Sequence, residues 1–155
     1  MDKKDVTWYV LVTLTILSIS YLAYITPIEN ILSVYSFRRI YPWYLPWRIA
    51  LVNFFGWLSL EIIPSSSKNK YLFFAKFLCL LLFLIGHYWS LYIVASKGYR
   101  VEIIPLFYVT YWRNIGTLHL DLGQVVVLYV VGYFLWRKFS KKFTLRKPPQ
   151  TPSNT

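Results

Sequence analysis

The chain has 155 residues, of which 57% are hydrophobic, 21% aromatic and only 15% charged. A soluble domain of this size carries about a quarter of its residues as charged side chains, so this composition argues against one. Disorder of the whole chain is excluded too, because it requires low hydrophobicity. We therefore interpret the sequence as an integral membrane protein that forms a single domain over residues 1–142 and is followed by a disordered basic and Pro-rich tail over residues 143–155.

Residues 6–25 form the first apolar run, which carries no charged side chain. Twenty residues of helix rise by about 30 Å, the thickness of a bilayer's hydrocarbon core. A cleaved signal peptide is the alternative, but the run exceeds a normal signal core and no small-residue cleavage site follows it. Pro27 ends this run, and the aromatic, basic stretch up to Pro46 predicts an interfacial segment with a surface helix.

The next two runs predict spans over residues 47–63 and 71–96, separated by a polar turn. Residues 99–117 are apolar and β-branched but are interrupted by Pro105, so we expect an interfacial excursion or a short hairpin there. A fourth span is predicted over residues 115–139. The fold class expected is therefore an all-α membrane protein of four transmembrane helices with two interfacial segments.

Charge sets the expected orientation, because cytoplasmic loops are enriched in Lys and Arg. Four spans place both termini on the same side of the membrane. That side carries eleven of the 17 basic residues, and the other side carries six. We therefore expect a multi-pass protein of the cell membrane with both termini cytoplasmic. The basic tail is expected to contact anionic lipid headgroups, and this explains the net charge of +11 without nucleic acid.

Polar residues recur at helical spacing within the predicted spans. One such stripe joins Lys76, Cys79, His87 and Ser90; the others contain Asn53 with Glu61, Tyr9 with Thr13, Ser20 and Tyr24, and Asp121 with Gln124. Hydrogen bonding between packed helices is the reading we favour for these stripes. For Glu61 we expect an ion pair with Lys68 or Lys76, and for Asp121 a capping role at a helix N-terminus.

His87 and His119 are the two histidines of the chain, and they are the candidate cofactor-binding residues. Both are predicted to lie in the outer half of the membrane, so they could ligate a haem b from two sides, with a quinone near the stripe around His87. The structural alternative is that His87 bonds a neighbouring carbonyl or Ser while His119 lies at the interface. No catalytic or metal motif occurs, so we expect neither an enzyme nor a metal site.

The leading hypothesis is therefore a non-catalytic accessory subunit of a larger membrane complex, such as a respiratory or electron-transfer assembly, whose partners are other integral membrane subunits. Its support is the small polar content of the spans and a high Trp and Tyr content, which suits protein contacts and membrane interfaces. The alternatives are a haem- or quinone-binding electron-transfer subunit using His87 and His119, or a small oligomeric transporter or channel.

Overall fold

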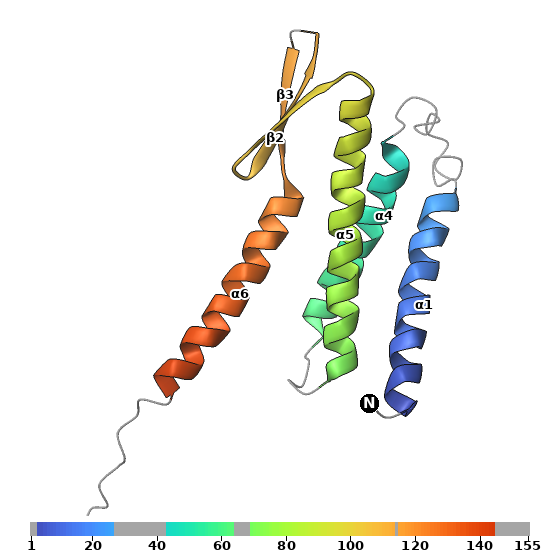
Figure 1. Ribbon diagram of the computed structural model, residues 1–155, viewed down its shortest axis with the longest axis vertical. Helices are drawn as coiled ribbons and strands as arrows, with labels where there is room; N and C mark the ends of the chain where they lie inside the picture. Colours follow the sequence, from blue (N-terminus) through green and yellow to red (C-terminus); the bar gives the residue numbers. More distant parts are fainter. Residues whose placement is uncertain (1–2, 27–42, 64–68, 114, 145–155) are drawn as a thin grey trace, which may run out of the picture.

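A computed structural model describes residues 3–26, 43–63, 69–113 and 115–144 of the chain. These residues are mostly helical and include one small antiparallel sheet (Figure 1). In chain order the elements are α1 (Lys3–Ile25), α4 (Tyr44–Ile62), α5 (Lys70–Ser96), β1 (Arg100–Ile104), β2 (Phe107–Trp112), β3 (Ile115–Leu120) and α6 (Leu122–Thr144). The expectation of a mostly helical chain with four helices is thus confirmed for the described residues, but the chain is not all-α.

Helices α1 and α5 are long and apolar enough to cross a membrane. Local chemistry sets the ends of α5. Asn69 caps its start, because the side-chain oxygen accepts hydrogen bonds from the backbone N–H groups of Tyr71 at 3.1 Å and Leu72 at 3.2 Å. Gly98 follows its end with a φ of 88°, a left-handed conformation that glycine adopts without strain.

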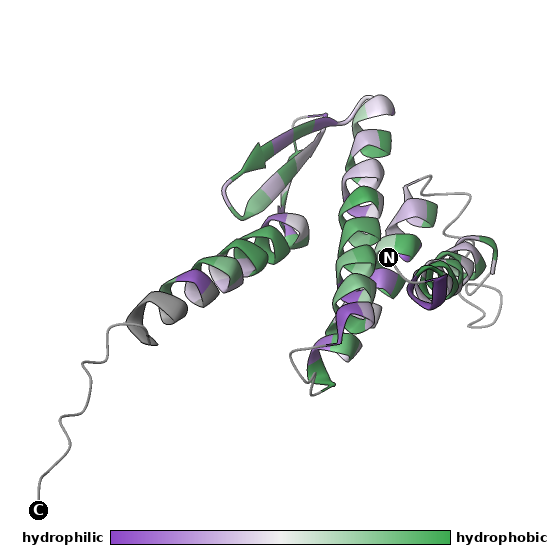
Figure 2. Cartoon of the chain, turned by 60° about the horizontal axis from the view of Figure 1, so that its bottom comes forward, coloured by the Kyte–Doolittle hydropathy of each residue, from purple (hydrophilic) through white to green (hydrophobic). Residues whose placement is uncertain are grey.

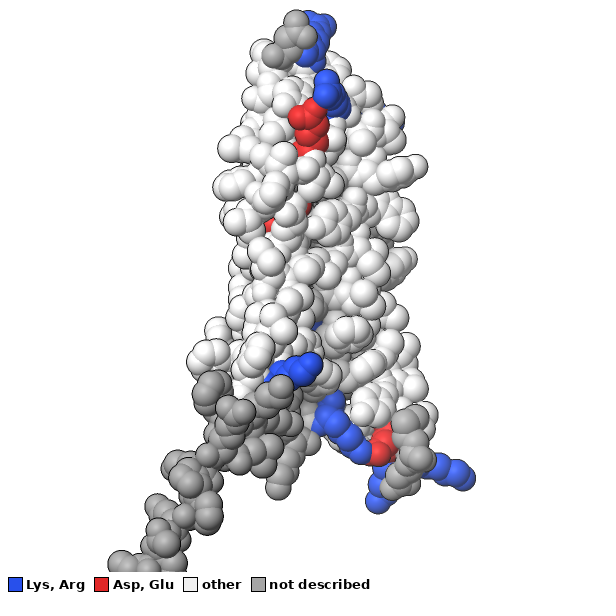
Figure 3. Space-filling view, turned by 60° about the vertical axis from the view of Figure 1, so that its left-hand side comes forward, with Lys and Arg blue, Asp and Glu red and all other residues white. Residues whose placement is uncertain are grey.

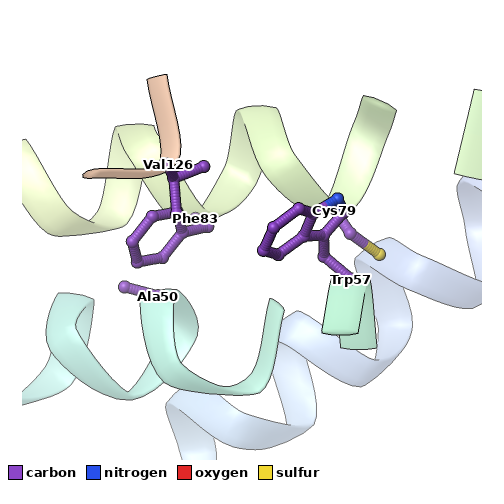
Figure 4. Packing of buried hydrophobic residues seen from close by; sticks show 5 residues of the cluster. All are labelled: Ala50, Trp57, Cys79, Phe83 and Val126. Atoms are coloured by element: carbon purple, nitrogen blue, oxygen red, sulfur yellow. The ribbon is translucent and has the colours of Figure 1, made fainter. Parts of the chain in front are cut away.

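The core lies where α4 packs along α5. Ala50 and Trp57 of α4 face Phe83 and Cys79 of α5, and Val126 of α6 completes the cluster (Figure 4). Gly86 permits the closest approach of the two helices. A methyl group on Gly86 would lie 2.9 Å from the backbone oxygen of Pro46 and 3.0 Å from the backbone nitrogen of Ala50. Small residues at such a crossing allow the dispersion contacts that hold helices together in lipid.

Helix α1 joins this pair through polar as well as apolar contacts. Buried Asn53 of α4 donates to the hydroxyl of Ser20 in α1 at 2.8 Å. Arg48, near the start of α4, donates to the Tyr24 backbone oxygen near the end of α1. The expected role of Asn53 and Ser20 in helix packing is therefore confirmed.

The sheet has the order β1–β2–β3, with both neighbouring pairs antiparallel. In the first pair Ile104 lies opposite Phe107, so Pro105 and Leu106 form a two-residue turn, in which Leu106 adopts a φ of 67°. In the second pair Tyr108 lies opposite His119. The hairpin expected within residues 99–117 is therefore present, and a third strand extends it.

Helix α6 begins at Leu122 rather than near Ile115, where the fourth span was expected to start. Ile115–Leu120 is apolar and carries no charge, so hydropathy alone merges it with the helix that follows. Helix α6 starts well below the upper end of α5 and then leans away from the other helices (Figure 1). Hydrophobic residues cover most of its first half (Figure 2).

The interfacial segment expected after the first span falls mostly within residues 27–42, which lie outside the described residues. The tail predicted to be disordered over residues 143–155 begins inside α6, which ends at Thr144, and residues 145–155 are again outside the described part.

Candidate functional site

A buried histidine–aspartate pair joins α5 to the start of α6. Nε2 of His87 lies 3.0 Å from Oδ1 of Asp121, whose side chain is fully buried at 0% exposure, while His87 is almost fully buried. A carboxylate oxygen accepts hydrogen bonds, so Nε2 of His87 carries the hydrogen that it donates to Asp121. Burial favours such pairing, because a carboxylate without a partner away from water is strongly disfavoured.

Asp121 also caps α6, as the sequence predicted. Its Oδ1 accepts from the backbone N–H of Gln124 at 3.1 Å, and its Oδ2 accepts from the Gln124 side-chain amide at 3.0 Å. An acidic cap satisfies a free N–H of the first turn and interacts favourably with the positive end of the helix dipole. One carboxylate thus serves both the helix start and His87.

Gln124 extends this network to the β1–β2 turn. Its amide nitrogen donates to the backbone oxygen of Ile104 at 3.0 Å, and its amide oxygen accepts from the backbone N–H of Leu106 at 2.9 Å. The backbone N–H of Asp121 donates to the Leu106 oxygen at 2.9 Å. The hairpin is therefore attached to α6 through the polar backbone atoms of its turn.

Gly123 makes room for this arrangement. A methyl group at Gly123 would lie 2.8 Å from Cδ2 of His87 and 2.9 Å from the hydroxyl of Tyr88. These distances are shorter than van der Waals contact, so a larger residue would push α6 away from α5. Glycine at this position therefore allows Asp121 to lie within hydrogen-bond distance of His87.

Aromatic rings continue the cluster from His87 into the sheet. The Tyr108 ring lies 6.3 Å from the His87 ring and stacks on the His119 ring at 4.9 Å. His119 Nε2 lies 3.2 Å from the Thr110 hydroxyl.

The two candidate haem ligands therefore lie in one cluster but on different elements, His87 in α5 and His119 in β3, with the Tyr108 ring contacting both. Nε2 of His87 is hydrogen-bonded to Asp121, so ligation of a metal through that atom requires breaking this bond. The haem hypothesis and the quinone hypothesis stay predictions.

The other polar expectations concern the opposite end of the helices. Glu61 of α4 accepts from Nζ of Lys76 in α5 at 3.1 Å, which confirms the expected ion pair. Beside it, Asp5 of α1 accepts from Lys70 and from the hydroxyl of Tyr71 in α5. Among the described residues no group of three or more His, Cys, Asp or Glu side chains could hold a metal ion.

The pairing of His87 with Asp121 was not predicted from the sequence, which indicated only a capping role for Asp121. The predicted fourth span also included His119, whereas His119 lies in β3 and Asp121 just before α6. The usable signal was that both His87 and Asp121 are isolated polar residues in apolar surroundings, where a buried acid needs a partner.

Comparisons with known proteins returned no match: no family model, no curated protein and no solved structure is similar to this chain. The site itself is a hydrogen-bonded network that joins α5, α6 and the β1–β2 hairpin at one level of the molecule.

Proposed function

We propose that this chain is a multi-pass membrane protein with four crossings, which serves as a non-catalytic subunit of a larger membrane complex. Support for the membrane comes first from the two helices that are long and apolar enough to span it, and then from the exposed surface. On the face drawn in Figure 3, charged side chains gather at the two ends, and the long stretch between them is almost free of them. A bilayer favours this distribution.

The orientation we propose has both termini on the cytoplasmic side. The contact of Asp5 with Lys70 and Tyr71 places the start of α1 beside the start of α5, and the distal end of α6 points toward the same end of the molecule (Figure 1). Lys97, Arg100 and Arg113 belong to the opposite end. An excess of cations at the end that holds the start of α1 and the end of α6 would support this orientation by the positive-inside rule.

The subunit role is supported by one observation above others, the exposure of α6. From Val127 to Trp136 all residues but Val130 are exposed, and this stretch includes Tyr129, Tyr133 at 49% and Trp136 at 75%. Apolar side chains there are satisfied by lipid, but a phenol hydroxyl at that depth needs a hydrogen-bond partner. Gly132 lies between the two tyrosines and has open space around it, which suits close approach of another helix.

A photocrosslinking amino acid in place of Tyr133, introduced in the native host, tests this proposal. We expect a discrete crosslinked product with one integral membrane protein, identified by mass spectrometry. If the crosslinked protein is a subunit of an electron-transfer complex, the result also supports the more specific hypothesis that the host is an electron-transfer assembly. The Tyr133→Phe variant removes only the hydroxyl and should weaken co-purification of that same protein in mild detergent.

The proposal fails if crosslinkers at Tyr129, Tyr133 and Trp136 all give lipid adducts alone and the protein purifies as a monomer. If the protein is not an integral membrane protein, alkaline carbonate will release it from membranes, and this can be measured before any crosslinking. The two results separate the role of the protein from its location.

A further inference from the structure

We propose that the β1–β2 turn, together with the strand ends beside it, is inserted into the hydrocarbon of the outer leaflet, so that β3 and α6 form one composite crossing. This inference rests on the proposed membrane location and goes beyond it, because an irregular interfacial hairpin would lie in the headgroups. The partner that we assign to this surface is the acyl-chain region of the lipid.

The length of α6 is the first argument. Its apolar part, Leu122–Trp136, rises by about 22 Å at helical geometry, whereas the hydrocarbon core is about 30 Å thick. Arg137 and Lys138 follow directly and belong at the interface. A helix that ends at the inner interface therefore begins about 8 Å inside the outer boundary of the hydrocarbon.

The contact between α6 and α5 gives a second, independent value for the depth of the start of α6. The 27 residues of α5 rise by about 40 Å, so a centred α5 projects about 5 Å beyond the hydrocarbon at each side. His87 precedes Ser96, the last residue of α5, by about 13 Å of helix, which places it about 8 Å inside the hydrocarbon. Its 3.0 Å contact with Asp121 fixes the start of α6 at that level.

The turn lies at this level too, because Leu106 is hydrogen-bonded to Asp121 and to Gln124. Figure 1 shows the β1–β2 turn beside the start of α6, while the far ends of β2 and β3 point away from the helices. The sheet therefore reaches from the outer aqueous side down to the depth of His87.

Three polar backbone atoms at the turn have partners that suit a medium without water. The Ile104 oxygen, the Leu106 nitrogen and the Leu106 oxygen are all bonded to Gln124 or Asp121, and Pro105 has no N–H to satisfy. Non-helical backbone is tolerated at membrane depth only where the protein supplies such partners. A turn in water would not require them.

Side chains change along the strands in the same direction. Around the turn they are apolar and exposed, namely Ile103, Ile104, Leu106, Phe107, Leu118 and Leu120. Farther from the turn lie Glu102 and Arg100, which form an ion pair, and then Tyr99, which stacks on Trp112. This change from an apolar tip to charged and aromatic side chains matches the passage from hydrocarbon to the membrane interface.

Spin labelling tests the proposal. Leu106→Cys in a Cys79→Ala background is labelled with a nitroxide and reconstituted into vesicles of phosphatidylcholine with phosphatidylglycerol. Collision rates with oxygen, which concentrates in hydrocarbon, are compared with those of a water-soluble nickel chelate. Leu14→Cys on the exposed face of α1 is the lipid control, and Lys97→Cys is the water control.

We expect the label at Leu106 to favour oxygen over nickel by a factor between those at Lys97 and at Leu14, because the turn lies about 8 Å inside the hydrocarbon and Leu14 is the middle residue of α1. A ratio equal to that at Lys97, or weak collisions with both reagents, overturns the proposal, since the turn would then lie in water or under protein. Ile103→Cys, at 58% exposure, serves as a second site if the Leu106 variant does not fold. If Leu14 itself is accessible to nickel, the proposed membrane location fails instead.

Discussion

The α4–α5 pair and α6 are both apolar, yet they are held to the molecule in different ways. Helix α4 packs along α5 through an apolar cluster and the close approach at Gly86. Helix α6 contributes Val126 to that cluster, but its attachment depends on the polar bonds of Asp121 and Gln124 at its first turn. The apolar contacts of α6 with the other helices include Leu122, Val126 and the Tyr129 ring against Trp57. Lipid competes well with apolar contacts and poorly with buried hydrogen bonds, so a helix with so few apolar contacts needs polar ones to stay attached.

The largest effect is expected for Asp121→Ala. The variant leaves the buried imidazole of His87 without its acceptor and removes the cap of α6. Breaking a buried pair from one side costs about 3 kcal/mol, to which loss of a cap adds about 1 kcal/mol. The free energy of unfolding in mixed micelles of increasing dodecyl sulfate content measures this loss.

Asp121→Asn is the matched control, because asparagine still caps a helix and still offers an oxygen to His87. We expect it to retain most of the stability that Asp121→Ala loses. Equal stability of Asp121→Ala and the parent protein would contradict the attachment of α6 by polar bonds.

Substitutions of two glycines, one in the α4–α5 contact and one on α6, test the difference in packing between these regions. Gly86→Ala places a methyl group against backbone atoms of α4 that cannot rotate away, so we expect a loss of about 1–3 kcal/mol from overpacking. Gly132→Ala on α6 meets open space and should stabilise the helix by up to about 1 kcal/mol. The same unfolding titration measures both, and a similar loss in the two variants would contradict the difference in packing.

Asn53→Ala tests the polar contact inside the bundle, between α4 and α1. It removes the buried hydrogen bond to Ser20, and such bonds between membrane helices contribute about 0.6 kcal/mol on average. Ser59→Ala is the control, since the Ser59 hydroxyl bonds only the Phe55 oxygen of its own helix and is exposed. A larger loss for Ser59→Ala than for Asn53→Ala would argue against an interhelical role of Asn53.

The sequence predicts elements well where hydropathy is uninterrupted. The spans expected over residues 6–25, 47–63 and 71–96 correspond to helices Lys3–Ile25, Tyr44–Ile62 and Lys70–Ser96. These boundaries are set by local signals such as Asn69 at a helix start and Gly98 after a helix end. Long apolar runs bounded by polar turns leave the chain little choice in a membrane.

Prediction was weaker at β3 and at the histidine site, for one physical reason. Ile115–Leu120 is as apolar as the helix that follows, so its strand structure comes from pairing with β2 and not from its own hydropathy. Asp121 marks the boundary, and with Gln124 three residues later it resembles a capping box, a signal that outweighs continuity of hydropathy. The pairing with His87 depends on tertiary contacts across 34 positions of sequence, which one chain does not reveal.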